Sequence, residues 1–243
     1  MIGCGCEVCT GNHPRNRRRR PSVQVITPTG ASVVIDTGPD FRDQVLSFGI
    51  DRVDAVFFTH EHADHVMGFD DVRRFTWERE TPLPVYAGPE TLQRLRVLYP
   101  YINELRIPGR AVPKARFLEW TGPQEAGGLR FVPLAVPHGG LACFGVLIEG
   151  AARRIAYIPD CASLPPLAQE KLQGIDVLIL NALRYTPHPS HLTLAQSLEW
   201  IERLAPAEAY LTHMGCALDY ASLPATLPPG VQMAYDGLEL PLA

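Results

Sequence analysis

The chain of 243 residues lacks any apolar run that approaches the roughly 20 residues needed to cross a bilayer. Its first residues also lack the apolar core and cleavage site of a secretory signal, so we expect a cytoplasmic protein with no membrane partner. An excess of one charge is missing too. The net charge of −4 argues against a polyanion-binding surface over the whole chain, and we do not expect nucleic acid as a partner.

Internal repeats, low-complexity tracts and linker-like stretches are absent as well. We therefore expect a single domain over residues 1–243, a length that one domain can fill. Hydrophobic residues make up 46% and charged residues 20% of the chain, which is typical of a globular protein and excludes a disordered one.

The 23 prolines and 20 glycines divide the chain into short apolar runs. A hairpin with its turn at Pro28-Thr29-Gly30 and two helices, over Pro89–Leu98 and Thr193–Leu204, stand out. Thr193 and Gln196 have the spacing of a capping box, which favours a helix start there. Many strands with helices between them predict a layered α/β fold. The strands are expected at Val23–Ile26, Ser32–Ile35, Val53–Thr59, Val85–Ala87, Leu129–Val136, Phe144–Ile148, Ile155–Ile158, Val177–Leu180 and Ala209–Thr212.

Basic residues gather near the N-terminus, within an Arg-rich loop expected over residues 1–20. Such a run can form a phosphate-binding or nucleic-acid-binding patch. It can also be a solvated turn before a strand, and we favour that interpretation. The run consists of Arg15, Arg17, Arg18, Arg19 and Arg20.

The densest chemistry lies in the segment Thr59-His60-Glu61-His62-Ala63-Asp64-His65. In an extended segment, His60 and His62 point to the same side and can bind one ion together. Asp64 and His65 lie just beyond and can turn toward a second ion. Imidazole and carboxylate ligands suit zinc, iron or manganese. Four such groups within six residues predict a metal site.

One segment cannot complete two metal sites, so further ligands must come from distant positions. The candidates are His138 after an apolar run, Asp160 in Tyr157-Ile158-Pro159-Asp160, and His213 in Leu211-Thr212-His213. Each lies just beyond an expected strand. Ligands at strand ends can converge along one rim of a sheet sandwich, where function often resides on loops.

A second metal site is expected from the cysteines. In a cytosolic chain of this size, Cys4-x-Cys6-x-x-Cys9 favours metal binding over disulfides. A structural zinc needs four ligands, and Cys216 is our first choice for the fourth, with His13 the second. Cys143 and Cys161 are expected to be small buried residues.

The segment THEHADH, followed by a distant His, Asp and His, resembles the metallo-β-lactamase fold superfamily from Val23 onward. The resemblance implies a four-layer αββα sandwich and an active site with two divalent metals, zinc or manganese. It implies that Asp36 supports the metal loop, and that Asp160 bridges the two metals. It assigns His60, His62 and His138 to one metal, and Asp64, His65 and His213 to the other.

The motif CxCxxC, followed by PRNRRRR and DTGPDFR, is similar to the phosphodiesterases of the carbon–phosphorus lyase pathway. That resemblance implies hydrolysis of a small cyclic phosphate, of the phosphoribosyl 1,2-cyclic phosphate or 2′,3′-cyclic nucleotide type, by a metal-bound hydroxide. Relatives commonly have His where this chain has Cys216. They also begin with a strand before CxC, so the first sheet is expected to lack that strand.

The loop His188-Pro189-Ser190-His191-Leu192-Thr193 resembles the catalytic loop of the same family. The resemblance implies that His191 is the acid that protonates the leaving oxygen. Asp64 is expected to take part in catalysis as well as in metal binding. Arg184 and His188 are weaker candidates for contacts with the substrate phosphate. Relatives are often dimers, which makes a homodimer a further expectation.

Other functions use the same ligands. A nuclease of the tRNA 3′-end processing type is one alternative, although the chain shows no evident arm to hold tRNA. An iron-dependent redox enzyme of the same fold is another. A thioester or lactam hydrolase would have no evident need for His191. A binding module without catalysis would tolerate a broken ligand cluster, but here every metal-binding residue type is in place.

Overall fold

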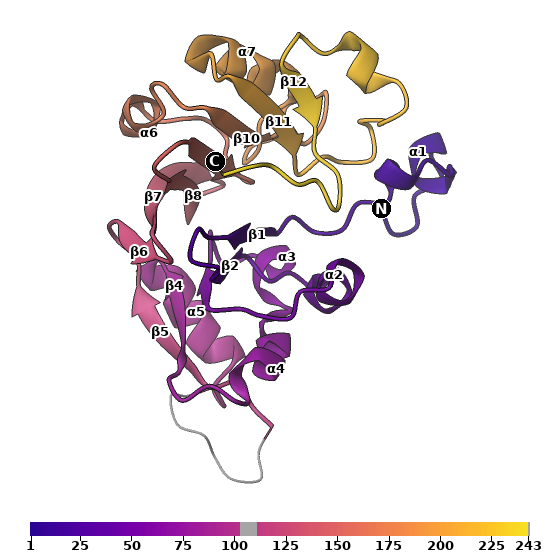
Figure 1. Cartoon of the computed structure of the whole chain (residues 1–243). Coiled ribbons are helices and arrows are strands. Elements are labelled where there is room, and N and C mark those ends of the chain that lie inside the picture. Colours follow the sequence, from indigo (N-terminus) through magenta and orange to yellow (C-terminus); the bar gives the residue numbers. More distant parts are fainter. Residues whose placement is uncertain (103–110, 243) are drawn as a thin grey trace. The chain divides into compact units, whose positions relative to one another are not determined.

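The computed structural model describes residues 1–102 and 111–242. Two β-sheets with helices form a mixed α/β fold, which confirms the predicted fold class. One sheet has five strands in the order β1-β2-β3-β4-β5, and the other has seven in the order β12-β11-β10-β9-β8-β7-β6 (Figure 1). None of the helices within the described residues is both long and apolar enough to span a membrane.

Contacts divide the chain into two compact units, which we describe one at a time. Unit 1 comprises residues 1–19 and 134–243, and unit 2 comprises residues 20–133. The boundary falls inside strand β7 (Leu129–His138). The expectation of one domain over residues 1–243 stays a prediction.

Unit 2 contains the five-stranded sheet. Its first two strands form an antiparallel hairpin, and the next three are added in parallel. The hairpin turns where Gly30 donates its N–H to the carbonyl of Thr27, with a positive φ of 79° that suits glycine. The elements of this unit are β1 (Val23–Ile26), β2 (Ser32–Ile35), α2 (Phe41–Phe48), β3 (Ala55–Phe57), α3 (Ala63–Val66), η2 (Phe69–Val72), α4 (Arg73–Thr76), β4 (Leu83–Ala87), α5 (Pro89–Leu98), β5 (Ala115–Glu119) and β6 (Gln124–Ala126).

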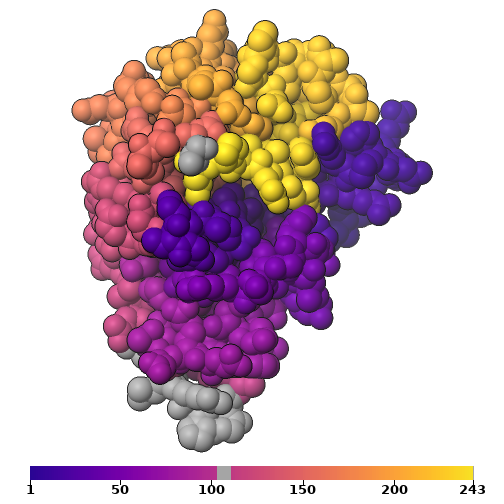
Figure 2. Space-filling view, viewed as in Figure 1, coloured from indigo at the N-terminus to yellow at the C-terminus, as the bar shows by residue number. Residues whose placement is uncertain are grey.

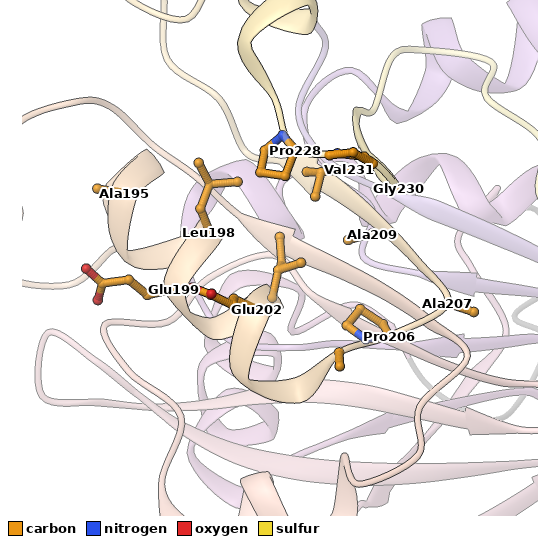
Figure 3. Close-up of a pocket in the computed structure, with 13 residues that line it drawn as sticks. Ala195, Leu198, Glu199, Glu202, Pro206, Ala207, Ala209, Pro228, Gly230 and Val231 are labelled. Atoms are coloured by element: carbon orange, nitrogen blue, oxygen red, sulfur yellow. The ribbon is translucent and has the colours of Figure 1, made fainter.

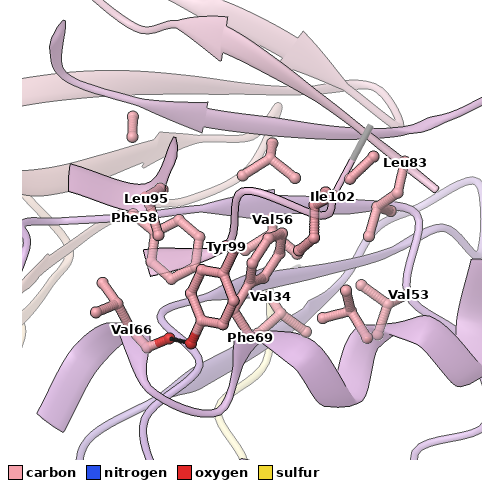
Figure 4. Packing of buried hydrophobic residues seen from close by; sticks show 14 of the residues in the cluster. Val34, Val53, Val56, Phe58, Val66, Phe69, Leu83, Leu95, Tyr99 and Ile102 are labelled. Carbon is pink, nitrogen blue, oxygen red and sulfur yellow. Dashed lines mark hydrogen bonds between the residues drawn. The ribbon is translucent and has the colours of Figure 1, made fainter. Parts of the chain in front are cut away.

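An apolar core fills the space between the sheet and the helices of unit 2 (Figure 4). Alternate residues of β4 face this core, as the period of a half-buried strand requires. Tyr99 reaches across the core, and its hydroxyl donates to the carbonyl of Val66 at 2.7 Å, in the last turn of α3. The core therefore holds the short helix that carries part of the histidine motif.

Unit 1 contains a sheet whose strands β9, β10, β11 and β12 run parallel, with β8 added in an antiparallel manner. Helix α7 begins with the predicted capping box: Thr193 accepts the N–H of Gln196, whose side chain accepts the N–H of Thr193. The elements of this unit are α1 (Glu7–Thr10), η1 (Pro14–Asn16), the last part of β7, β8 (Leu141–Glu149), β9 (Arg154–Ile158), α6 (Pro166–Lys171), β10 (Val177–Asn181), α7 (Leu194–Leu204), β11 (Glu208–Thr212), η3 (Leu223–Thr226) and β12 (Val231–Met233).

The N-terminal segment of unit 1 packs against its C-terminal loops (Figures 1 and 2). Asn16 donates to the carboxylate of Asp219 at 2.7 Å and accepts the N–H of Tyr220. Ahead of β1, the described residues form the short helices α1 and η1. The expected absence of a strand before the cysteines stays a prediction.

Candidate metal centres

The histidine motif of unit 2 lies between the end of β3 and the first turn of α3. The Nε2 atom of His60 is 3.0 Å from the Nδ1 atom of His62, so two imidazoles present ring nitrogens to one point. Helix α3 brings Asp64 and His65 onto the following turn, where Oδ2 of Asp64 is 3.7 Å from Nε2 of His65. The bend predicted after His62 is therefore a helix start. The motif supplies one pair of imidazole nitrogens and one pair of an imidazole nitrogen and a carboxylate oxygen, and both kinds of ligand suit zinc or manganese.

Asp36 is the buried carboxylate that holds this motif in place. Its Oδ1 accepts the N–H of Thr59, and its Oδ2 accepts the Thr59 hydroxyl, both at 2.8 Å. The same Oδ2 is 2.8 Å from Nδ1 of His65. Because a carboxylate accepts, Nδ1 of His65 carries the proton, which makes Nε2 the metal-binding atom. The contact expected for Asp36 is confirmed, and Thr59 is a partner that the sequence did not single out.

Two glycines let the backbone pack closely behind the motif. A Cβ on Gly38 would lie 2.1 Å from the carbonyl oxygen of Asp64, and one on Gly68 would lie 2.1 Å from that of Gly38. Thr37 stands between them in this arrangement: its N–H donates to His65, and its carbonyl accepts the N–H of Gly68, both at 2.8 Å. Neither glycine was predicted, because the close approach involves segments about 30 residues apart.

Unit 1 gathers the distant candidates at the ends of its strands. His138 ends β7, Asp160 follows β9 and His213 follows β11. The Oδ1 atom of Asp160 is 3.3 Å from Nε2 of His213 and 3.3 Å from Nδ1 of His191. The ligand atoms of His138, Asp160 and His191 lie within 4.8 Å of one another. The predicted convergence at strand ends is therefore found within this unit.

His138 and His213 are held by the backbone around them. Nδ1 of His138 donates to the carbonyl of Ser190 at 2.9 Å, which makes Nε2 the atom able to bind a metal. His213 has a positive φ of 51°, an unusual conformation for a residue other than glycine. Such outliers cluster at functional sites, where the surrounding structure maintains them.

His191 lies in the loop before α7, two residues ahead of the helix cap. Burial, opposed by the carboxylate of Asp160, lowers the pKa of His191 to about 4. The imidazole is therefore neutral at pH 7 in the protein alone. To act as an acid, it has to gain its proton together with an anionic substrate, whose charge favours the imidazolium form.

The two weaker candidates belong to the same loop. The guanidinium of Arg184 donates to the carbonyls of Thr186 (3.0 Å) and Pro187 (2.6 Å), and so holds the loop backbone. Nδ1 of His188 accepts the N–H of Ser190, which places its proton on Nε2. Their contacts with a substrate stay predictions.

A buried polar group that the sequence did not reveal lies next to Asp160. The amide of Asn181 donates to the carbonyl of Cys161 at 3.2 Å, and the Cys161 thiol donates to the Asn181 amide oxygen at 3.1 Å. The hydroxyl of Ser197, in α7, donates to the Asn181 carbonyl. Cys161 and Cys143 are buried, as predicted.

The cysteine cluster lies entirely within unit 1. The sulfur atoms of Cys4, Cys6, Cys9 and Cys216 all lie within 4.8 Å of one another, and those of Cys4 and Cys216 are 3.9 Å apart. Zinc–sulfur bonds of about 2.3 Å in a tetrahedron place sulfurs about 3.8 Å apart. The backbone N–H of Cys9 lowers the pKa of Cys6 to about 7, which favours a thiolate, whereas burial raises the pKa of the Cys216 thiol to about 11, so Cys216 needs a nearby cation to ionise. The four sulfurs thus fit a zinc ion.

The second choice for the fourth ligand, His13, stacks on Tyr220 with ring centroids 5.5 Å apart and is not part of this cluster. The predicted solvated turn is found only in part: Arg15, Arg17 and Arg20 are exposed, whereas Arg18 and Arg19 are half-buried. Arg15 lies over the ring of Tyr235, Arg18 donates to backbone carbonyls of the loop after His213, and Arg19 pairs with Asp236.

A pocket of about 550 Å³ lies elsewhere on unit 1, between α7 and the loop before β12 (Figure 3). Leu198 and Val231 line its apolar wall, and Glu199 and Glu202 are its acidic residues. Its described lining contains neither histidine nor cysteine, so it offers none of the ligands discussed above.

A family model for the β-lactamase superfamily domain matches residues 31–214. A protein of Porphyromonas gingivalis named octanoyltransferase is 36% identical over 98% of this chain, but the chain spans only 48% of its length. A ribonuclease Z of Bradyrhizobium diazoefficiens is 28% identical over 72% of the chain and 60% of its own length. The chain therefore covers about half to three fifths of these two relatives.

Two solved structures are matched over more than nine tenths of their own length. A diphosphatase from the PhnP family is 37% identical, with a TM-score of 0.90 over 100% of this chain and 92% of its own. The zinc-bound PqqB of Methylobacterium extorquens has a TM-score of 0.76 at 20% identity, over 99% of this chain and 95% of its own, and shares the fold.

Proposed function

Since the chain belongs to the β-lactamase superfamily and is a metal-dependent hydrolase with the metallo-β-lactamase fold, we propose that it hydrolyses a small cyclic phosphodiester. The substrate would be of the phosphoribosyl 1,2-cyclic phosphate or 2′,3′-cyclic nucleotide type. The observation that carries this proposal is the position of His191, whose imidazole is 3.3 Å from the carboxylate of Asp160. A proton donor beside a metal-binding carboxylate suits the departure of a sugar oxygen.

We propose an active site with two divalent ions, zinc or manganese. We propose that His60, His62 and His138 hold one, that Asp64, His65 and His213 hold the other, and that Asp160 serves both. The chemistry of the side chains supports this assignment: in each unit, imidazole nitrogens lie beside a carboxylate, and hydrogen bonds of His65 and His138 select Nε2 for binding. Bound ions of this kind activate water at neutral pH and offset charge on a phosphate.

The chain's own residues would supply the rest of the reaction. His191 would transfer a proton to the leaving oxygen of the sugar, after the substrate phosphate has raised its pKa from about 4. Asp64 would orient the attacking water through its carboxylate. Nε2–H of His188 would donate to a phosphate oxygen, and Arg184 would keep the loop in register through its bonds to Thr186 and Pro187.

We further propose a structural zinc bound by Cys4, Cys6, Cys9 and Cys216. It would fix the N-terminal loop to the turn that begins with His213, three residues before Cys216. The cytoplasm, where thiols stay reduced, suits such a cluster. A homodimer is a separate proposal, which sedimentation of the purified protein would test.

A diphosphatase is the second candidate function. It is favoured by the solved structure with that name, which is 37% identical over the whole chain. Both reactions break a phosphorus–oxygen bond, but the leaving group differs: an alkoxide for the cyclic ester and a phosphate for the diphosphate. A phosphate is a good leaving group, so His191 would contribute less to cleavage of a diphosphate.

The decisive experiment is a substrate panel with the protein loaded with manganese or zinc. Bis-p-nitrophenyl phosphate would show phosphodiesterase activity, and cyclic ribose phosphates, a nucleotide diphosphate and a precursor tRNA would distinguish the candidates. We expect the highest kcat/KM on a cyclic ribose phosphate. Preference for the diphosphate would replace the proposal by the second candidate, and cleavage of the tRNA would favour a nuclease. Oxygen consumption by the protein loaded with iron would indicate an iron-dependent redox enzyme.

A further inference from the structure

The fourth sulfur changes the charge of the proposed zinc site. Zinc with four thiolates carries a charge of −2, whereas zinc with three thiolates and a neutral histidine carries −1. Two further carboxylates, Asp219 and Asp236, lie on the loops that follow Cys216. A site of this charge is costly in a partly buried position unless cations lie close to it.

Two cations lie close to this site: the Met1 ammonium is 3.0 Å from the Cys9 sulfur, and the guanidinium of Arg18 contacts the turn that carries Cys216. Nη1 of Arg18 donates to the carbonyls of Gly215 at 3.0 Å and Met214 at 3.5 Å, on the N-terminal side of Cys216. Its Nη2 donates to the carbonyl of Leu218, two residues beyond. One planar guanidinium therefore binds the backbone on both sides of the fourth cysteine.

The environment of Arg18 is electrostatically unusual for an arginine. Burial lowers the pKa of its guanidinium, while Asp219, Asp236, Cys216 and Cys9 act in the opposite direction. These are the negative groups of the loop and two of the four sulfurs. The guanidinium thus lies within reach of the charge that the fourth thiolate adds.

Neighbouring arginines are engaged elsewhere. Arg15 lies 3.9 Å above the ring centroid of Tyr235, and Arg19 pairs with Asp236 at 3.2 Å. Arg17 is exposed. Arg18, by contrast, donates hydrogen bonds to the backbone on both sides of Cys216.

We propose that Arg18 is the counter-charge that allows a fourth thiolate, Cys216, to bind zinc in place of a neutral ligand such as histidine. This inference rests on the proposed structural zinc. It gives one arginine of the N-terminal run a specific role: to stabilise the doubly negative site and to hold the Cys216 turn in the conformation that presents its sulfur.

The experiment measures zinc affinity by competition with a coloured chelator, on the full chain, together with zinc content by elemental analysis. We expect Arg18→Gln to raise the zinc dissociation constant about tenfold, since a unit charge a few ångströms away is worth at least that at the dielectric of a protein surface. Arg18→Lys keeps the charge but loses the planar set of donors. On a logarithmic scale, its zinc dissociation constant should rise by less than half as much as that of Arg18→Gln. Arg17→Gln removes an exposed charge one residue away and should leave the affinity within about twofold.

Cys216→His supplies the second half of a double-mutant cycle, because it changes the charge of the zinc site from −2 to −1. In that background we expect Arg18→Gln to change zinc affinity less than threefold, about half of the effect on a logarithmic scale. The inference would be overturned if Arg18→Gln lowered zinc affinity tenfold in both backgrounds, or if Arg18→Lys and Arg18→Gln lowered it equally. Either result would show that Arg18 acts only by holding the loop through hydrogen bonds. Absence of cysteine-bound zinc from the wild-type protein would instead refute the proposed zinc site itself. Circular dichroism of each variant identifies any that does not fold.

Discussion

The Nδ1 atom of His65 lies 2.8 Å from the Oδ2 atom of Asp36, and neither side chain is exposed to solvent. This pair determines which nitrogen of His65 can bind a metal. It also links the strand that ends before Asp36 to the helix that carries Asp64 and His65.

Asp36→Asn should weaken metal binding while leaving the fold intact. The amide can present its NH₂ group to His65, which would move the proton of the imidazole to Nε2 and block the metal-binding atom. We expect metal affinity to fall about 10–100-fold, the range typical of such supporting partners. Titration of metal-depleted protein with manganese would measure it. Asp51→Asn, an exposed change in the same unit, is the matched control, and equal affinity of the two variants would contradict the role of Asp36.

His191→Ala should affect substrates according to their leaving groups. If His191 donates a proton to an alkoxide, its removal should lower kcat on a cyclic ribose phosphate by roughly 10²–10⁴. The effect on bis-p-nitrophenyl phosphate should be much smaller, because p-nitrophenolate departs without a proton. Metal content should not change. Equal losses on the two substrates would assign His191 to metal or phosphate binding instead of proton transfer.

Thr193→Ala should remove the capping box of α7. The variant leaves the N–H of Gln196 without its acceptor, and the free energy of unfolding should fall by about 1 kcal/mol. Chemical denaturation would measure the change. Thr193→Ser keeps the hydroxyl and should retain most of the stability, so a serine variant as unstable as the alanine variant would argue against the cap.

Glu208→Gln should make the protein less sensitive to acid. The hydroxyl of Tyr210 and the guanidinium of Arg153 lower the pKa of Glu208 below its ordinary value. A carboxylate with a lowered pKa adds stability above the pKa of the unfolded chain, about 4.3 for glutamate, and this stability is lost as the pH falls through the folded value.

The free energy of unfolding, followed between pH 6 and pH 3, should therefore decline less steeply in Glu208→Gln than in the wild type. Glu199→Gln, an exposed change on α7, should keep the wild-type slope. If the two variants decline alike, the contacts of Glu208 do not contribute to acid stability.

The sequence predicted the elements whose apolar pattern is decided locally. The bounds of β1, β2 and α5 agree with prediction, and α7 begins after the predicted cap. Helix α2 was not among the predicted elements, although Gly49 ends it in the left-handed conformation that glycine favours. Strand β12, with three residues, depends on pairing with β11 and has little signal of its own.

Within the site, metal-ligand residue types were evident because they are rare and closely spaced. What the sequence did not show were the contacts between remote segments. Arg18 was expected to be solvated, but its acceptors lie about 200 residues away. Cys161 and Asn181 also exchange hydrogen bonds that the sequence could not predict. A buried cysteine and an asparagine at a strand end form no local sequence pattern that pairs them.

The positions of Gly38 and Gly68 have no room for a side chain, whatever reaction the protein catalyses. Even a methyl group at either position would meet a carbonyl oxygen at 2.1 Å, and the backbone of Asp64 or Gly38 would have to move. A randomised library made to change substrate preference should therefore keep both codons fixed. Diversity introduced instead at the exposed residues Tyr185 and Thr186 would vary the loop while keeping His188, His191 and both glycines.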